Sequence, residues 1–387
     1  MRWVEDGEER SARWFSETNA PPPTRVALAD DKLTADEAYG LAGQGTALLW
    51  RGDFQNAKQL LNALASRADR RSRKRGKSAG SGHASSAPAP SAADAFHLHR
   101  QARSQRSRTL GALLIPLNAD YTIPLRRAPD VRQACMEAYG PATDASVMPL
   151  RALLGAIGAH EWRIKGIDIP AAGGRIHPYY GVFAPIRREY VDLVATAPLP
   201  AGLAESSVAF DIGTGTGVLA AILARRGVER VIATDQDPRA LACARENLER
   251  LGLLDRVTVE AADLFPAGRA MLVVCNPPWV PARPSSPLEG AIYDPDSRML
   301  RGFLSALPAH LEPGGEGWLI LSDIAEHLGL RTRDELLATF DAAGLQVVER
   351  LDVRPTHPRA SDPTEPLHAA RAAEVTSLWR LTAAQKT

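Results

Sequence analysis

The chain has 387 residues, enough for two or three domains at roughly 150 residues each. Its 46 basic and 45 acidic residues give a formal charge of +1, which excludes a uniformly basic nucleic-acid coat protein and a uniformly acidic tail protein. The three cysteines, Cys135, Cys243 and Cys275, lie far apart and form no CxxC pair, which excludes a disulfide scaffold or a zinc finger and suits a reducing compartment.

Neither the chain as a whole nor its beginning resembles a membrane or secretory sequence. No apolar run approaches the roughly 18–20 residues that span a bilayer. Residues 1–14 carry four acids and no apolar core of a signal peptide. We therefore expect a cytoplasmic protein without a membrane partner.

Residues 1–66 predict an N-terminal, mainly helical region. Thr34 and Glu37 are spaced as a helix capping box. Apolar residues then recur at helical intervals from Leu48 and Leu49 to Leu64. We expect a small helical hairpin here.

Residues 67–108 predict a basic, low-complexity, disordered linker. Two arginine-rich stretches, 67–77 and 100–108, flank a segment rich in Ser, Gly, Ala and Pro at 78–93. Such a composition has too few apolar residues to bury a core. The linker is either a solvated spacer or a contact for nucleic acid.

Residues 109–205 predict an ancillary, substrate-recognition region. The pattern indicates a helix at 148–160, a β-hairpin within 161–186 around Gly173 and Gly174, and a second helix at 187–196.

From residue 206 to 387, apolar strands alternate with amphipathic helices, which predicts an α/β domain with a mostly parallel sheet covered on both faces. The last two strands have only a Pro- and His-rich loop, 354–372, between them, which favours an antiparallel terminal hairpin. The predicted strands are 207–212, 230–235, 256–262, 270–276, 317–322, 345–353 and 374–382, and the predicted helices are 217–226, 237–251, 297–311 and 331–343.

The first of these strands ends in a glycine-rich turn with Asp211, Gly213, Thr214, Gly215 and Gly217. Its G-x-G-x-G spacing is not the G-x-G-x-x-G of dinucleotide binders, and it lacks the G-K-[ST] of a phosphate loop. An aspartate facing the crevice repels a pyrophosphate and attracts an ammonium group. This pattern predicts S-adenosylmethionine, which carries an ammonium and a sulfonium, as the cofactor.

The second strand ends at Asp235, followed by Gln236, about 20 residues past the glycines. A carboxylate at this place is positioned to bind both ribose hydroxyls of the cofactor. The competing role, capping the next helix, falls to a separate residue, Asp237 before Pro238.

The third strand leads into Asp263 and Leu264. Asp263 is a candidate acceptor for the adenine amino group, and Leu264 a candidate to pack on the ring. The alternative is an ordinary loop aspartate.

The fourth strand ends in Asn276-Pro277-Pro278-Trp279, the candidate catalytic residues. The two prolines remove two backbone donors and leave the Asn276 side-chain oxygen and the Pro277 carbonyl as acceptors. Two convergent acceptors suit an NH₂ group, whose lone pair they direct at the methyl group. Trp279 offers a flat face for a planar amide or base.

Together, D-x-G-T-G-T-G, Asp235, A-D-L-F and N-P-P-W resemble class I S-adenosylmethionine-dependent methyltransferases of the amino-group type, over about 206–382. Residues 180–190, with Arg187, Arg188 and Glu189, look like the segment that precedes the glycine motif in HemK-type glutamine N5-methyltransferases. In that family the segment lies over the acceptor, and a helical N-terminal domain is typical. Trp279 stands where those enzymes usually have tyrosine.

The resemblance implies a Rossmann-like, seven-stranded sheet and N-methyl transfer to a protein glutamine, with a translation factor as a possible partner. The alternatives are an amino group of an RNA or DNA base, reached with the help of the basic linker, and a non-catalytic nucleotide-binding module. No histidine lies in a metal-binding pattern, so no metal is expected. His357 and His368 are either surface residues or part of an active-site lid at 354–372.

Overall fold

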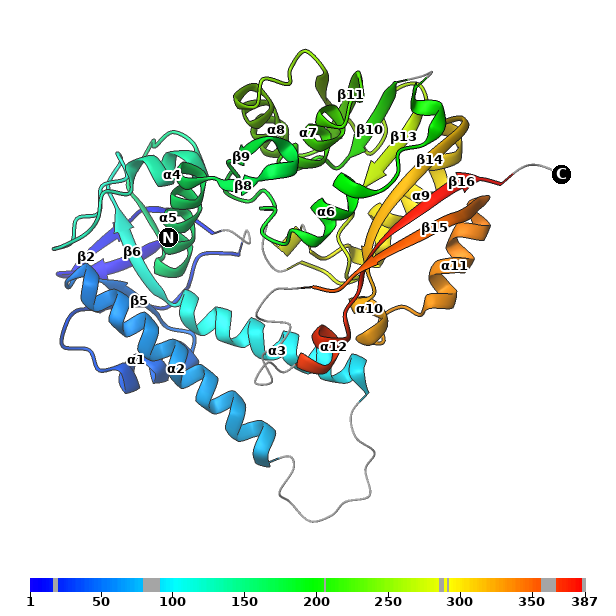
Figure 1. Cartoon of the computed structure of the whole chain (residues 1–387). Coiled ribbons are helices and arrows are strands. Elements are labelled where there is room, and N and C mark those ends of the chain that lie inside the picture. The colour runs from blue at the N-terminus through cyan, green and yellow to red at the C-terminus, as the bar shows by residue number, and fades with distance from the viewer. Residues whose placement is uncertain are drawn as a thin grey trace. The chain divides into compact units, whose positions relative to one another are not determined.

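The computed structural model describes the chain except residues 17–19, 79–90, 205–206, 285–288, 291, 356–366 and 385–387, and the side chains of 71–78. It forms two compact units, which are described separately (Figure 1). The N-terminal unit comprises residues 1–90 and 97–161, and the C-terminal unit comprises residues 91–96 and 162–387.

The N-terminal unit is built on a five-stranded mixed sheet of order β3-β7-β6-β5-β4, with a separate hairpin of β1 and β2. Its strands are β1 (Arg2–Glu5), β2 (Glu8–Ser11), β3 (Arg13–Trp14), β4 (Val26–Ala29), β5 (Ala47–Trp50), β6 (Leu113–Leu117) and β7 (Ser146–Pro149). Its helices are α1 (Ala35–Gly43), α2 (Phe54–Ser78), most of α3 (Ala92–Gly111), α4 (Arg132–Tyr139) and most of α5 (Leu150–Lys165).

The expectation of a mainly helical N-terminal region is therefore wrong. The capping box of Thr34 and Glu37 forms at the start of α1 as predicted. Leu48 and Leu49, however, lie in β5, which pairs in parallel with β4 and β6 and is buried along its whole length. A strand buried on both faces is a continuous apolar run, which periodicity alone does not distinguish from part of a helix.

The expectation of a disordered linker at 67–108 is wrong over the residues that the structure describes. Residues 67–78 continue α2 and residues 92–108 lie in α3, whereas 79–90 fall outside the described residues. Arginine is a good helix former, so a basic stretch that follows an apolar helix can extend it. Arg106 of α3 also binds Asp69 of α2 with an N–O distance of 2.7 Å, so part of the basic charge joins the two helices.

The C-terminal unit holds a seven-stranded sheet of order β12-β11-β10-β13-β14-β16-β15, which confirms the α/β class. The first five strands in this order are parallel, and β16 is antiparallel to both of its neighbours. The strands are β10 (Val208–Ile212), β11 (Arg230–Asp235), β12 (Val257–Ala261), β13 (Ala270–Cys275), β14 (Leu311–Ser322), β15 (Leu345–Val353) and β16 (Thr376–Ala383).

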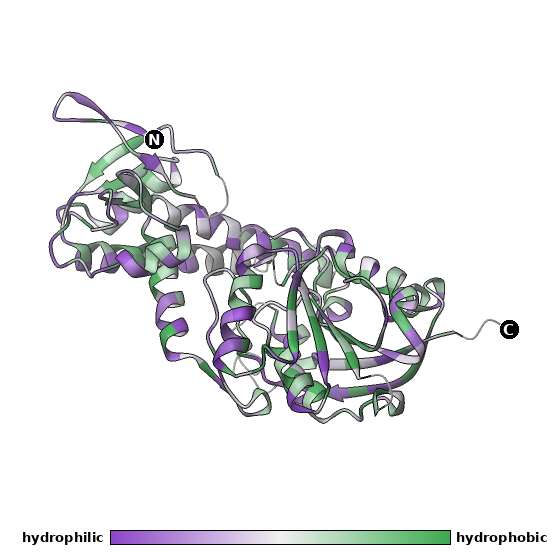
Figure 2. Ribbon diagram, turned by 90° about the horizontal axis from the view of Figure 1, so that it is seen from above, coloured by the Kyte–Doolittle hydropathy of each residue, from purple (hydrophilic) through white to green (hydrophobic). Residues whose placement is uncertain are grey.

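Helices pack on both faces of this sheet through two apolar clusters. One cluster joins α6 and α7 to alternate strand residues such as Ala209 and Val231, and the other joins α9 and α11 to the residues between them, such as Phe210 and Ile232. Hydrophobic residues accordingly run along the strands (Figure 2). The helices are α6 (Glu189–Thr196), α7 (Val218–Arg225), α8 (Pro238–Arg250), α9 (Arg298–His310), α10 (Ile324–His327), α11 (Arg333–Ala342) and α12 (His368–Ala373).

The predicted hairpin around Gly173 forms from β8 (Ile167–Ile169) and β9 (Gly174–Ile176). It belongs to the C-terminal unit, because Ile176 and the α6 residue Tyr190 share an apolar cluster with the sheet. The predicted division between 109–205 and 206–387 is therefore misplaced, since the compact units divide between residues 161 and 162.

Candidate active site

The glycine loop after β10 has the backbone that its sequence demands. Gly213, Gly215 and Gly217 have φ values of 72°, 56° and 80°, which residues with a side chain rarely adopt. The amides of Gly213 and Thr214 both donate to the carbonyl of Thr234, at 2.9 and 2.8 Å. The loop is thus fastened to the end of β11, the neighbouring strand.

Asp211 is buried beneath this loop, with 1% of its surface exposed. Its Oδ2 accepts hydrogen bonds from Thr214 Oγ1 (2.6 Å) and from the amide of Ala220 (3.0 Å). Burial raises the pKa of this carboxyl to about 6, and the nearby charge of Asp235 adds to the rise. The expectation that Asp211 faces the crevice is therefore wrong: it braces the loop against the first turn of α7.

Asp235 lies at the carboxyl end of β11, next to the glycine loop. Its Oδ2 accepts from the amide of Gly215 and its Oδ1 from that of Asp237, both at 3.0 Å. Burial raises the pKa of this half-buried carboxyl. The cap of α8 is indeed a separate residue, Asp237, with Pro238 in the first turn, and Gln236 is exposed beside it.

Asp263 and Leu264 follow β12 at the same edge of the sheet. The Asp263 carboxylate is exposed and pairs with Arg298 at 3.2 Å. Leu264 has a φ of 74°, an uncommon conformation for a residue with a side chain, and its carbonyl accepts from Thr234 Oγ1 at 2.5 Å. Such strain often accompanies a binding site, yet the sequence of this loop gave no sign of it.

Asn276, Pro277, Pro278 and Trp279 follow β13, which pairs with β10, so they lie beside the strand that leads into the glycine loop. The indole Nε1 of Trp279 donates to Asn276 Oδ1 at 2.9 Å. One of the two acceptor positions of that oxygen is thereby occupied by the chain itself. The thiol of the preceding Cys275 is buried, which raises its pKa well above the usual value and disfavours a nucleophilic role.

Arg187, from the segment before α6, lies against this tetrapeptide, and Glu374 contacts Arg187 in turn. The Arg187 guanidinium lies over the Trp279 ring, with its carbon 5.0 Å from the ring centroid, and Arg187 Nη1 donates to Glu374 Oε1 at 3.0 Å. Glu374 directly precedes β16, and no spacing rule connects it with residue 279. Only the insertion of β16 beside β14 brings it to this edge.

The predicted lid at 354–372 is described only in part. His357 falls outside the described residues, and His368 begins α12. Among the residues that the structure describes, no three His, Cys, Asp or Glu side chains cluster as metal ligands. Within the same residues, no helix has the length and apolar character needed to cross a membrane.

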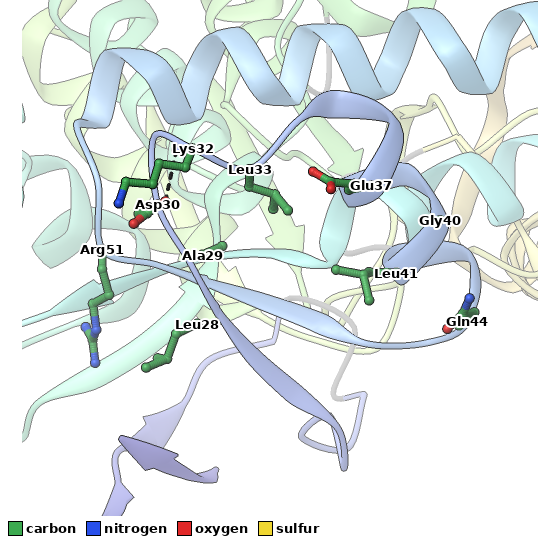
Figure 3. A pocket seen from close by; sticks show the side chains of 10 residues that line it. All are labelled: Leu28, Ala29, Asp30, Lys32, Leu33, Glu37, Gly40, Leu41, Gln44 and Arg51. Carbon is green, nitrogen blue, oxygen red and sulfur yellow. Dashed lines mark hydrogen bonds between the residues drawn. The ribbon is translucent and has the colours of Figure 1, made fainter. Parts of the chain in front are cut away.

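The N-terminal unit contains a separate open cavity of about 820 Å³ (Figure 3). None of the predicted site residues lines it, and the Asp30 carboxylate at its edge accepts from the amide of Lys32. Its lining consists of Leu28, Ala29, Asp30, Lys32, Leu33, Glu37, Gly40, Leu41, Gln44 and Arg51.

Comparison with known proteins finds a family model whose match includes both the glycine loop and the tetrapeptide. Residues 176–343 match the model of the methyltransferase small domain. A release factor glutamine methyltransferase of Cereibacter sphaeroides is 35% identical over 180 residues, which cover 41% of this chain and 62% of that protein. A ribosomal protein L11 methyltransferase of Sorangium cellulosum is 33% identical over 156 residues, 40% of each chain.

A third relative is named for a nucleic-acid substrate and not for a protein. A tRNA1(Val) (adenine(37)-N6)-methyltransferase of Shewanella loihica is 30% identical over 148 residues, 35% of this chain and 59% of that protein. The matched region, residues 176–343, includes the glycine loop and the tetrapeptide and is similar to a methyltransferase domain. The chain spans less than two thirds of each of these relatives.

Proposed function

We propose that the chain methylates the side-chain nitrogen of a protein glutamine with S-adenosylmethionine. The observation that carries this proposal is the position of Asn276, Pro277 and Pro278 at the carboxyl end of β13, next to the glycine loop of β10. Ligands of parallel α/β sheets bind at this edge, where the strand order reverses.

Asn276 and Pro277 would hold the acceptor nitrogen. The side-chain oxygen of Asn276 and the carbonyl of Pro277 each accept one N–H of a primary carboxamide, which directs the nitrogen lone pair away from both oxygens. The bound cofactor supplies an electrophilic methyl group on its sulfonium. As the new N–C bond forms, the methyl–sulfur bond breaks with its electron pair left on sulfur, and the nitrogen loses one proton to water. The chain would contribute mainly position and electrostatics.

The loops around this position would hold the cofactor. Asp235 is the proposed ribose ligand, since its half-buried carboxylate lies at the glycine loop. Asp263 and Leu264 are the proposed adenine contacts, with Gln236 beside the ribose. Asp211, which is buried under the loop, would act through Thr214 and not as a ligand of the ammonium group.

Two observations favour a carboxamide over a nucleic-acid base. Arg187 covers one face of Trp279, and the ring also packs against the apolar clusters on both sides of the sheet, which leaves little of it for stacking a base. The first relative described above is named for glutamine methylation. An amino group of an RNA base is the second candidate, because one relative is named for adenine methylation and α2 and α3 are rich in arginine.

Tritiated S-adenosylmethionine distinguishes the two candidates. The enzyme is incubated separately with a recombinant bacterial release factor and with total RNA, and the products are digested and analysed by mass spectrometry. We expect label in the protein as N5-methylglutamine, and none with Asn276→Ala of unchanged melting temperature. Label that enters RNA alone and appears as a methylated base would overturn the glutamine proposal.

A further inference from the structure

Arg187 connects four segments of the C-terminal unit that lie far apart in the sequence. It precedes α6, lies over the ring of Trp279 after β13, and binds Glu374 before β16. Glu374 Oε1 also accepts from Ser322 Oγ, at the end of β14, at 2.7 Å. The Glu374 side chain is buried, with 6% of its surface exposed. The Arg187 guanidinium therefore binds a carboxylate that is itself hydrogen-bonded to the end of β14.

Trp279 in turn determines which atom Asn276 presents. An indole N–H only donates, so its hydrogen bond to Asn276 requires the oxygen, and not the NH₂ group, on that side. A flipped Asn276 carboxamide would present a donor where the proposed mechanism needs an acceptor. The ring position thus selects the productive orientation of the catalytic side chain.

The remaining edge of the Arg187 guanidinium has no competing hydrogen bond. Its Nε lies 3.6 Å from Glu189 Oε1, an ion-pair distance, but in the part of the chain that the structure describes neither Nε nor Nη2 makes a hydrogen bond. The closest contacts of this side chain are therefore its hydrogen bond to Glu374 and its stack on the Trp279 ring, with the longer ion pair to Glu189 beside them. The hydrogen bond to Glu374 fixes the position of the guanidinium, and the guanidinium in turn keeps the Trp279 indole in place.

We propose that Arg187 is a positioning residue of the acceptor site, which acts through Trp279 to keep the Asn276 oxygen directed at the acceptor nitrogen. A flat guanidinium stacks on an aromatic ring better than an ammonium does, so lysine is not an equivalent residue here. The contacts with Glu374 and Ser322 fix Arg187, Arg187 fixes the ring, and the ring fixes the carboxamide.

The first test needs no acceptor substrate. In the ¹⁵N-labelled protein, the indole N–H signal of Trp279 is assigned by its loss in Trp279→Phe, and its exchange with solvent is measured. Arg187→Lys keeps the positive charge beside Glu374 but removes the flat stack on the ring. We expect hydrogen exchange of the Trp279 indole N–H to accelerate about tenfold, because a partly desolvated cation–π contact is lost. An unchanged signal in this variant would overturn the proposal.

The matched control is Arg350→Lys. The Arg350 guanidinium lies 4.9 Å from the ring centroid of Trp379 and is 27% exposed, against 26% for Arg187. Arg350→Lys therefore removes a similar arginine–tryptophan contact between β15 and β16, which β14 separates from β13, while Arg333 remains 5.3 Å from the same ring. We expect the Trp279 signal and methyl transfer to be unchanged in this control, and a change equal to that of Arg187→Lys would also refute the assignment.

The second test rests on the proposed function and uses a release factor as the acceptor. We expect Arg187→Lys and Trp279→Phe each to lower kcat about tenfold with little change in cofactor affinity, and the double variant to be no slower than either single variant, since both act on one chain of contacts. Independent, multiplying effects would mean that Arg187 has a merely structural role. If the wild-type enzyme leaves the release factor unlabelled, the glutamine proposal fails, whereas the exchange measurement still decides the role of Arg187.

Discussion

Arginine–carboxylate pairs occur in two very different surroundings in this molecule. In the N-terminal unit, Arg106 and Asp69 join α2 to α3 with side chains 39% and 50% exposed. In the C-terminal unit, Arg380 and Glu316 join β16 to β14 with both side chains 12% exposed. Water and salt screen the first pair, whereas the second has been removed from water. An arginine–carboxylate ion pair is thus a weak surface contact between two helices in one unit, and a buried contact between two strands in the other.

The largest expected effect comes from breaking the buried pair. Arg380→Met leaves Glu316 without its two guanidinium contacts, at 2.7 and 2.8 Å, and we expect the free energy of unfolding to fall by about 3–5 kcal/mol. Denaturant titration measures this loss. Arg380→Met with Glu316→Gln should recover part of it, because the buried charge of Glu316 is then gone and only the exposed Glu349 has lost its arginine. A loss as small as that of a surface pair would show that burial does not distinguish the two systems.

Asp211 sharpens the comparison, because it is a buried carboxyl that has hydrogen bonds but no arginine. Its pKa of about 6 lies above the ordinary value of 3.8, so the folded state binds its proton more tightly than the unfolded state does. Its contribution to stability is therefore present at acidic pH and lost as the pH rises through about 6.

Asp211→Asn tests this sign directly. We expect the variant to gain stability relative to the wild type as the pH rises from 4 to 7, by about 2–3 kcal/mol, the equivalent of the pKa shift. Unfolding free energies of both proteins at several pH values measure the difference. A constant difference across this range would contradict the raised pKa.

The smallest effect is expected for the exposed ion pair of Arg106 and Asp69. Arg106→Gln removes the ion pair with Asp69, and we expect the melting temperature to change by no more than about 1–2 °C. Added salt should reduce the difference between the variant and the wild type, because it screens this exposed pair. A drop of many degrees would place this pair in the same class as Arg380 and Glu316.

Much of the C-terminal unit could be predicted from sequence because its signals are local. The glycines at 213, 215 and 217 require positive φ, and Asp237 before Pro238 is a complete cap within two residues. The end of each strand could therefore be placed closely, and with it the position of Asn276. What local signals do not give is the contact made by a side chain, so the burial of Asp211 was not foreseen.

The errors have physical causes of two kinds. The sequence around Leu48 and Leu49 predicts a helix, yet these residues form a strand, because a buried strand and a buried helical turn are equally apolar. Glu374 was not recognised because its place depends on pairing between β14 and β16, whose residues are far apart in the chain. Both involve contacts between distant segments, which no window of neighbouring residues contains.

The place of β16 also has a consequence for how the protein is made. The strand at residues 376–383 follows both β14 and β15 in the chain but occupies an interior position in the sheet between them. Until it emerges from the ribosome, β14 has an open edge and β15 has no strand to pair with, and exposed strand edges promote association with other chains. The nascent C-terminal unit should therefore depend on protection until residues 374–383 have emerged, and its complete sheet and its Glu374 contact should then form together.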